Sequence, residues 1–169
     1  MESTVRIGAA CVMTAASAWG GRLMAGAQAR RAEALSEAVS GVKRLEIEML
    51  ERRMPLRDAL SLAGGIFLEA AGEMEGGAPP GEAWIRAEGR LTERGSVLDC
   101  IGECDKTALR RLFDGLGSGG LQTQRLVLSE AEEELERLGR QALKKSEEQG
   151  KLYASLGALS GLAMALILL

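Results

Sequence analysis

The feature that most constrains this chain is its last stretch, an uncharged apolar run from Leu152 to Leu169. As an α-helix with a rise of about 1.5 Å per residue, the run spans about 27 Å, close to the roughly 30 Å hydrocarbon core of a bilayer. Lys151 and Tyr153 stand at its start, where a snorkelling cation and an interfacial aromatic ring are favoured. A soluble core helix of this composition would need a partner on every face. The run therefore predicts a C-terminal transmembrane helix over residues 152–169.

A weaker apolar stretch lies near the N-terminus, from Ile7 to Gly21, and extends to Ala29 if Arg22 snorkels or faces a partner. Two interpretations are open. Residues 1–29 form a retained membrane anchor, or Arg6 begins a signal peptide that is cleaved near Ala29. In the second case the remainder is an exported helical interaction protein, tethered to the membrane by its C-terminal segment.

The charges that flank the two apolar segments predict on which side of the membrane the central domain lies. Cytoplasmic flanks of membrane segments carry an excess of Lys and Arg. Arg6 is the only side-chain cation outside both segments, so the central domain is predicted to be cytoplasmic. The cations on the inner flanks are Arg22, Arg30, Arg31, Lys144, Lys145 and Lys151.

Residues 30–151 are long enough for one compact domain, and their composition predicts an all-α fold, because Val, Ile, Thr and aromatic residues are scarce. Apolar residues recur at helical spacing, which predicts a small bundle. The expected helices cover about residues 30–52, 55–75, 82–91 and 97–116, and a long last helix from about residue 121 continues into the membrane segment. In that helix Glu133 and Glu136 are expected to pair with Arg137 and Arg140 at i,i+4 spacing.

Several function classes are disfavoured. The chain has no histidine, a net charge of −3 with interleaved charges, and no phosphate-binding, nucleophile-elbow or zinc-protease motif. Cys100 and Cys104 lack the further Cys or His ligands that a structural zinc requires. We therefore expect no catalytic residues, cofactor, metal, small-molecule substrate or nucleic-acid partner, and the protein is not expected to be an enzyme.

One pattern in the C-terminal segment carries a mechanism for association. Gly157 and Gly161 are four residues apart, and Ala165 follows four further on. Small residues at this spacing let two helix backbones approach in lipid. We expect these three residues to form a helix-packing face.

The order of short motifs resembles the stage III sporulation protein AB family. The segment Leu45-Glu46-Ile47-Glu48 is followed by Pro55-Leu56 and Ala59-Leu60, and then by Ala83-Trp84. Leu116-Gly117 and Gln124 come next, and the terminal segment closes the pattern. The family's Ser-Asp after Leu-Gly is replaced by Gly119-Gly120, which removes a helix-capping side chain.

This resemblance implies a component of the sporulation channel complex between mother cell and forespore, required for spore formation. It implies a cytoplasmic helical domain similar to the F-type platform proteins of type II secretion, and an N-terminal anchor that is retained. The implied partners are a cytoplasmic secretion-type ATPase and the other membrane subunits of the complex. The implied location is the mother-cell membrane surrounding the forespore.

Overall fold

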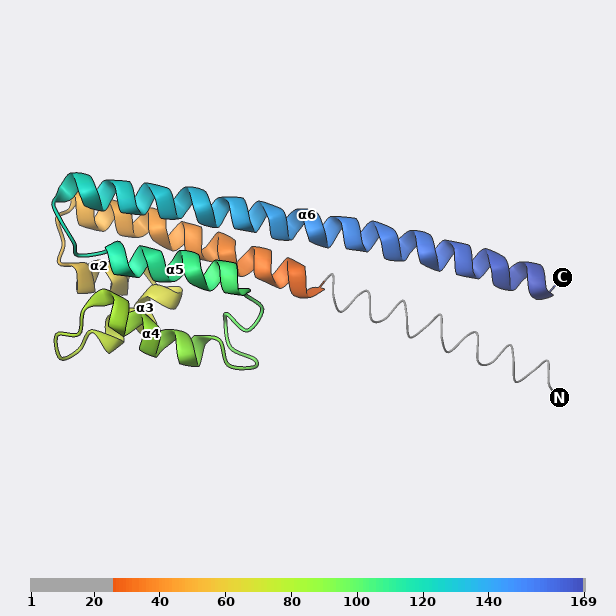
Figure 1. Ribbon diagram of the computed structural model, residues 1–169, viewed down its shortest axis with the longest axis horizontal. Coiled ribbons are helices and arrows are strands. Elements are labelled where there is room, and N and C mark those ends of the chain that lie inside the picture. The colour runs from red at the N-terminus through yellow and green to blue at the C-terminus, as the bar shows by residue number, and fades with distance from the viewer. Residues whose placement is uncertain (1–25, 169) are drawn as a thin grey trace. The chain divides into compact units, whose positions relative to one another are not determined.

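The computed structural model describes the backbone of residues 26–168 and the side chains of residues 26–152 and Ser155. All regular elements in this range are helical (Figure 1), as the composition predicts. A helix over residues 26–46 continues into the short π-helix η1 (Ile47–Glu51). The elements that follow are α2 (Leu56–Ala63), α3 (Gly65–Glu73), α4 (Pro80–Leu91), α5 (Glu103–Gly115) and α6 (Leu121–Leu168).

Residues Arg31–Gln141 form one compact unit. In it the helix over residues 26–46 and the first half of α6 lie side by side (Figure 1), and Lys43 joins them through Glu132 and Glu136, each at 3.2 Å. Helix α5 packs along this pair, and α3 and α4 close the bundle on the far side of α5. The second unit, within the described range, comprises residues 26–30 and residues 142–168 of α6.

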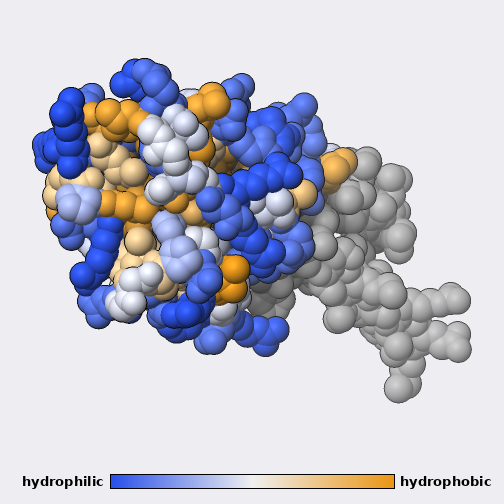
Figure 2. All heavy atoms as spheres, turned by 60° about the vertical axis from the view of Figure 1, so that its left-hand side comes forward, coloured by the Kyte–Doolittle hydropathy of each residue, from blue (hydrophilic) through white to orange (hydrophobic). Residues whose placement is uncertain are grey.

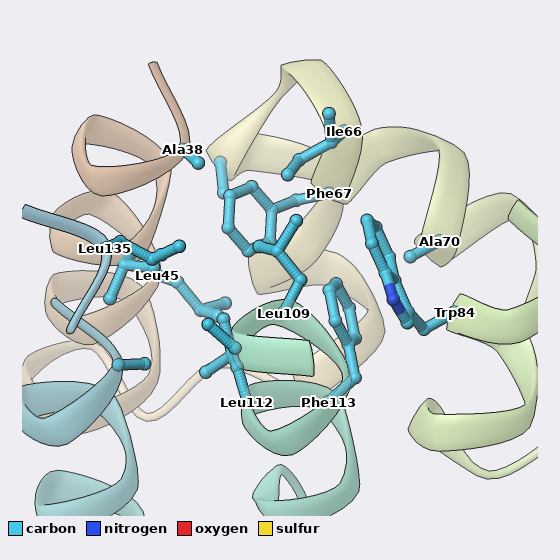
Figure 3. Close-up of a cluster of buried hydrophobic side chains, with 14 of the residues drawn as sticks. Ala38, Leu45, Ile66, Phe67, Ala70, Trp84, Leu109, Leu112, Phe113 and Leu135 are labelled. Atoms are coloured by element: carbon cyan, nitrogen blue, oxygen red, sulfur yellow. The ribbon is translucent and has the colours of Figure 1, made fainter. Parts of the chain in front are cut away.

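The core of the Arg31–Gln141 unit is built around three aromatic rings (Figure 3). Phe113 of α5 lies between Trp84 of α4, with ring centroids 4.5 Å apart, and Phe67 of α3, with centroids 5.8 Å apart. All three rings are buried. Stacked pairs of this kind add roughly 0.5–1.5 kcal/mol beyond the burial of their area. The leucines around them come from the helix over residues 26–46 and from α2, α5 and α6, so one core joins the helices of the unit.

Two expected helix boundaries are wrong. The predicted helix over residues 55–75 is broken into α2 and α3, because Gly64 and Gly65 adopt positive φ angles of 75° and 52°, which are not helical. The predicted helix over residues 97–116 begins only at Glu103. Residues 92–102 form turns instead, although Leu98 and Ile101 in this segment are buried as a helix would have required.

The expected membrane segments fall largely outside the described residues. Within the described part of the chain, no helix combines the length and apolarity needed to cross a bilayer. Residues 1–25 of the predicted N-terminal anchor lie outside the described range, and so do nearly all side chains of residues 152–169. The predicted packing residues Gly157, Gly161 and Ala165 are among them. The backbone of α6 is nevertheless helical through Leu168, so the long last helix is confirmed.

Candidate functional site at one end of the bundle

Several of the motif residues meet where α5 turns into α6. Helix α5 ends at Gly115, Leu116 is buried, and Gly117 adopts a φ of 79°, in the left-handed region where glycine is favoured. A β-carbon on Gly117 would lie 3.4 Å from Cδ2 of Leu56, the first residue of α2, and 3.7 Å from Cγ of Pro80, the first residue of α4. The Leu-Gly pair therefore sits against the starts of two other helices.

Gln124 holds this loop in place. Its side chain is buried, and Oε1 accepts a hydrogen bond from the Gly117 N–H at 3.2 Å. Its Nε2 donates to the carbonyls of Gly115, at 3.3 Å, and Ser118. One amide side chain thus satisfies three backbone groups in the turn between α5 and α6. Gly119 and Gly120 carry no capping side chain, and the turn is ordered by Gln124 together with the Ser118 hydroxyl, which donates to the Gly115 carbonyl at 2.7 Å.

The remaining motif residues build helices. Leu45, Ala59 and Trp84 are fully buried in the core. The Pro55 carbonyl accepts the first bond of α2, from the Ala59 N–H at 3.0 Å. Glu48 is mostly buried and accepts two hydrogen bonds from the exposed Arg52, at 2.9 and 3.1 Å, whereas Glu46 is half-buried. The pattern is therefore a framework for the fold and not a cluster of reactive groups.

Two bidentate ion pairs, each with a buried carboxylate, tie the helices together, and the motifs did not reveal them. Arg31 donates to both carboxylate oxygens of Asp105, at 2.6 and 2.7 Å, and the same carboxylate accepts the Gly102 N–H at 2.8 Å. Asp105 has no exposed side-chain surface, and its hydrogen bond raises the pKa of the Arg31 guanidinium. Arg110 and the buried Glu88 make a second bidentate pair, at 2.7 and 2.8 Å, between α5 and α4.

The sequence contains a signal for the contact of Asp105, but it can be recognised only when the start of α5 is known. Asp105 is the third residue of α5, where an acidic side chain accepts the backbone N–H that precedes the helix. Placing the helix start at residue 97 hid that relation. In α6 the expected pair of Glu136 and Arg140 is confirmed at 3.0 Å, but Arg137 pairs with Glu134 and not with Glu133.

The described residues offer little for chemistry on a small molecule. They contain no group of three or more side chains placed to hold a metal ion. Cys100 is half-buried in a turn and Cys104 is exposed in the first turn of α5, so the two do not share one helix as expected. A hollow of about 130 Å³ lies between the helix over residues 26–46 and the Gly64-Gly65 break. Ligand pockets are usually about 300–1,000 Å³.

The comparison with protein families agrees with the motif pattern. The profile of stage III sporulation protein AB matches residues 6–169. The chain belongs to this family. Membership implies a role in stage III of sporulation, and the family is a sporulation family, not a known family of enzymes. No curated protein and no solved structure matches the chain.

Proposed function

We propose that this member of the stage III sporulation protein AB family is a non-enzymatic platform in the mother-cell membrane surrounding the forespore. Its helical unit faces the cytoplasm and binds a secretion-type ATPase, and its apolar segments contact other membrane subunits of the sporulation channel complex. Family membership supports a role in sporulation. The Lys and Arg residues that flank the two apolar segments support a cytoplasmic helical unit.

The observation that carries this proposal is where the motif residues lie. Those with described side chains are mostly used to build the core or the turn between α5 and α6, and they bring no set of reactive groups together. An interaction platform needs a defined surface on a stable unit. Trp84 stabilises the core of the unit, and Gly117 and Gln124 fix the turn between α5 and α6. An enzyme would instead need polar groups that converge on a pocket.

Helix α6 supports the membrane part of the proposal. It runs without interruption from Leu121 to Leu168, so the bundle sequence and the apolar sequence belong to one helix. The spacing of Gly157, Gly161 and Ala165 gives that helix a small-residue face for a second membrane helix. No rearrangement of the backbone at Leu152 is needed for the segment to enter lipid.

The test is co-flotation of the purified ATPase with vesicles that carry the full chain. The matched variant is Leu159→Lys with Leu162→Lys, because each charge at the centre of a membrane helix costs roughly 2.5–3.5 kcal/mol. We expect the wild-type chain to float and to carry the ATPase with it. The double variant keeps the N-terminal apolar segment and should float less than the wild type; with Val12→Lys added to that segment, it should stay at the bottom of the gradient while still binding the ATPase in detergent. Flotation of the wild-type chain without the ATPase would contradict the platform function.

A further inference from the structure

The net charge of the chain changes sign beside the predicted membrane segments. Hydrophilic side chains also cover much of the bundle end that Figure 2 brings forward, so polarity alone does not single out one region. Residues 26–30 and 142–152 carry nearly all the described side chains of the second unit. They contain four cations and two carboxylates, whereas the whole chain has a net charge of −3. The six residues are Arg30, Lys144, Lys145, Lys151, Glu147 and Glu148. The stretch beside the apolar segments is therefore positive, and the remainder of the chain is acidic.

The fold leaves these four cations available. All four side chains are exposed. Three of them form no ion pair within the described part of the chain, and the fourth, Lys144, approaches Glu148 only to 3.9 Å. Arg31, one residue after Arg30, shows the contrast, because both carboxylate oxygens of Asp105 accept its hydrogen bonds. The four cations of the second unit therefore do not hold the bundle together through ion pairs.

Their positions along the chain give the cations one common depth. Helix α6 rises about 1.5 Å per residue, so Lys144 lies about 12 Å before Leu152, and Lys151 directly precedes it. Arg30 directly follows the N-terminal apolar stretch, which ends at Ala29. If both apolar segments enter the bilayer, the cations lie in or just outside the headgroup layer. The negative potential of a cytoplasmic membrane surface acts over a Debye length of about 8–10 Å, and long Lys and Arg side chains can reach toward it.

The directions of the side chains distinguish a lipid from a protein partner. Lys144 and Lys145 are adjacent in α6, so their side chains leave the helix about 100° apart. Arg30 lies on the other helix of the unit. A protein that binds one face would meet only some of these cations. Lipid headgroups surround a membrane protein on all sides, so cations that bind them need to share a depth and not a face.

We propose that Arg30, Lys144, Lys145 and Lys151 form a basic collar that binds the phosphates of anionic lipids of the phosphatidylglycerol type. This proposal rests on the proposed function, because the collar meets headgroups only when the apolar segments are in the membrane. Glu147 and Glu148 lie at the same depth and oppose part of the attraction. We therefore expect a preference for anionic over zwitterionic lipid of roughly 5-fold, the gain from about one cation at a charged surface.

The first experiment reconstitutes the full chain in phosphatidylcholine vesicles that contain a trace of spin-labelled lipid. Electron paramagnetic resonance then measures the fraction of label that the protein immobilises, with the label on phosphatidylglycerol or on phosphatidylcholine. The wild type should prefer phosphatidylglycerol by roughly 5-fold at low salt and less at 0.5 M salt, since salt screens exposed charges. Lys144→Gln, Lys145→Gln and Lys151→Gln combined should lower the preference below about 2-fold.

The matched control removes three charges elsewhere. Arg44→Gln, Arg94→Gln and Arg125→Gln combined change three exposed arginines of the Arg31–Gln141 unit, none of which forms an ion pair with another described residue. This control should keep the preference of the wild type. Replacing the three collar lysines by Arg should keep it as well, because the charge is retained, and this separates charge from side-chain packing.

The outcomes separate the two proposals. If the wild type immobilises both lipids equally, or if the triple glutamine variant of the collar keeps the preference, the basic collar is wrong and the platform function stands. If the wild type immobilises neither lipid, the chain does not contact the bilayer, and both proposals are wrong.

Discussion

The buried pair of Arg31 and Asp105 gives the sharpest prediction about stability. Asp105 accepts two bonds from Arg31 and one from the Gly102 N–H, and its side chain is fully enclosed, whereas 14% of the Arg31 side chain is exposed. Removing one partner of a buried pair costs about 3–5 kcal/mol when the other is left uncompensated. Arg31→Met should therefore cost about 3–4 kcal/mol.

The opposite substitution should cost less. In Asp105→Leu the guanidinium that remains is partly exposed and can turn toward water, so we expect a loss of about 2 kcal/mol. Arg31→Met combined with Asp105→Leu should be less destabilised than the sum of the two single variants by about 2 kcal/mol or more, since neither charge is then left alone.

The assay is urea unfolding of the full chain in detergent, followed by the fluorescence of Trp84. The ring is buried in the aromatic stack, and Trp19→Phe removes the other tryptophan of the chain. If the two single costs add to within about 0.5 kcal/mol in the double variant, the two side chains are not coupled and the reasoning fails.

Two further predictions follow. A β-carbon on Gly41 would lie 2.3 Å from Cε2 of the buried Phe67 ring, so Gly41→Ala should cost about 1–3 kcal/mol. Gly72→Ala, which meets no atom within 4 Å in α3, should be neutral or stabilise by up to ~1 kcal/mol, and equal urea midpoints for the two variants would contradict this packing. A hydrogen bond from Lys43 is the largest cause that holds the pKa of Glu136 below its ordinary value. The stabilisation that the Lys43–Glu136 pair gives the fold is therefore present at neutral pH. It is lost as the pH falls through the lowered pKa of Glu136, below about pH 4.5. Lys43→Gln should raise the midpoint of the Glu136 carboxyl in an NMR titration, and an unchanged midpoint would argue against the pair.

The helices and much of the core follow from periodicity alone. Leu35, Val42 and Leu45 recur at helical spacing and are all buried, as are Leu128 and Leu135 on α6. The reason is that a helix in a small bundle has one apolar face, and its spacing is visible in the sequence. The family prediction depended on the joint order of short motifs, and the profile match over residues 6–169 confirms it.

The boundaries were less visible for a local reason. Leu60 and Phe67 keep helical spacing across Gly64 and Gly65, so periodicity hid a break that depends on the positive φ of both glycines. Leu98 lies in the turns before α5 and is buried, as it would be on the apolar face of a helix. Its spacing therefore predicted a helix where the chain forms turns.

The ion pairs and the turn held by Gln124 could not be read from the sequence. Arg31 and Asp105 are 74 positions apart, and their contact depends on how two helices pack. Gln124 was identified as a motif residue, but its three backbone partners become clear only when α5 and α6 are placed. The positive φ of 54° at Arg53, where η1 ends, is likewise a property of backbone angles, which the sequence does not record.

The central claim is a membrane platform whose helical unit lies in the cytoplasm. The most direct measurement is labelling with a membrane-impermeant thiol reagent of intact, non-sporulating cells that produce the protein in their outer cell membrane, in variants that lack Cys11, Cys100 and Cys104 and carry one new cysteine. Ser129, exposed on α6, and Ser3 are the two probe positions. We predict that Ser129→Cys is shielded and Ser3→Cys is labelled. Labelling of Ser129→Cys in intact cells would place the helical unit outside the cytoplasm and contradict the platform function.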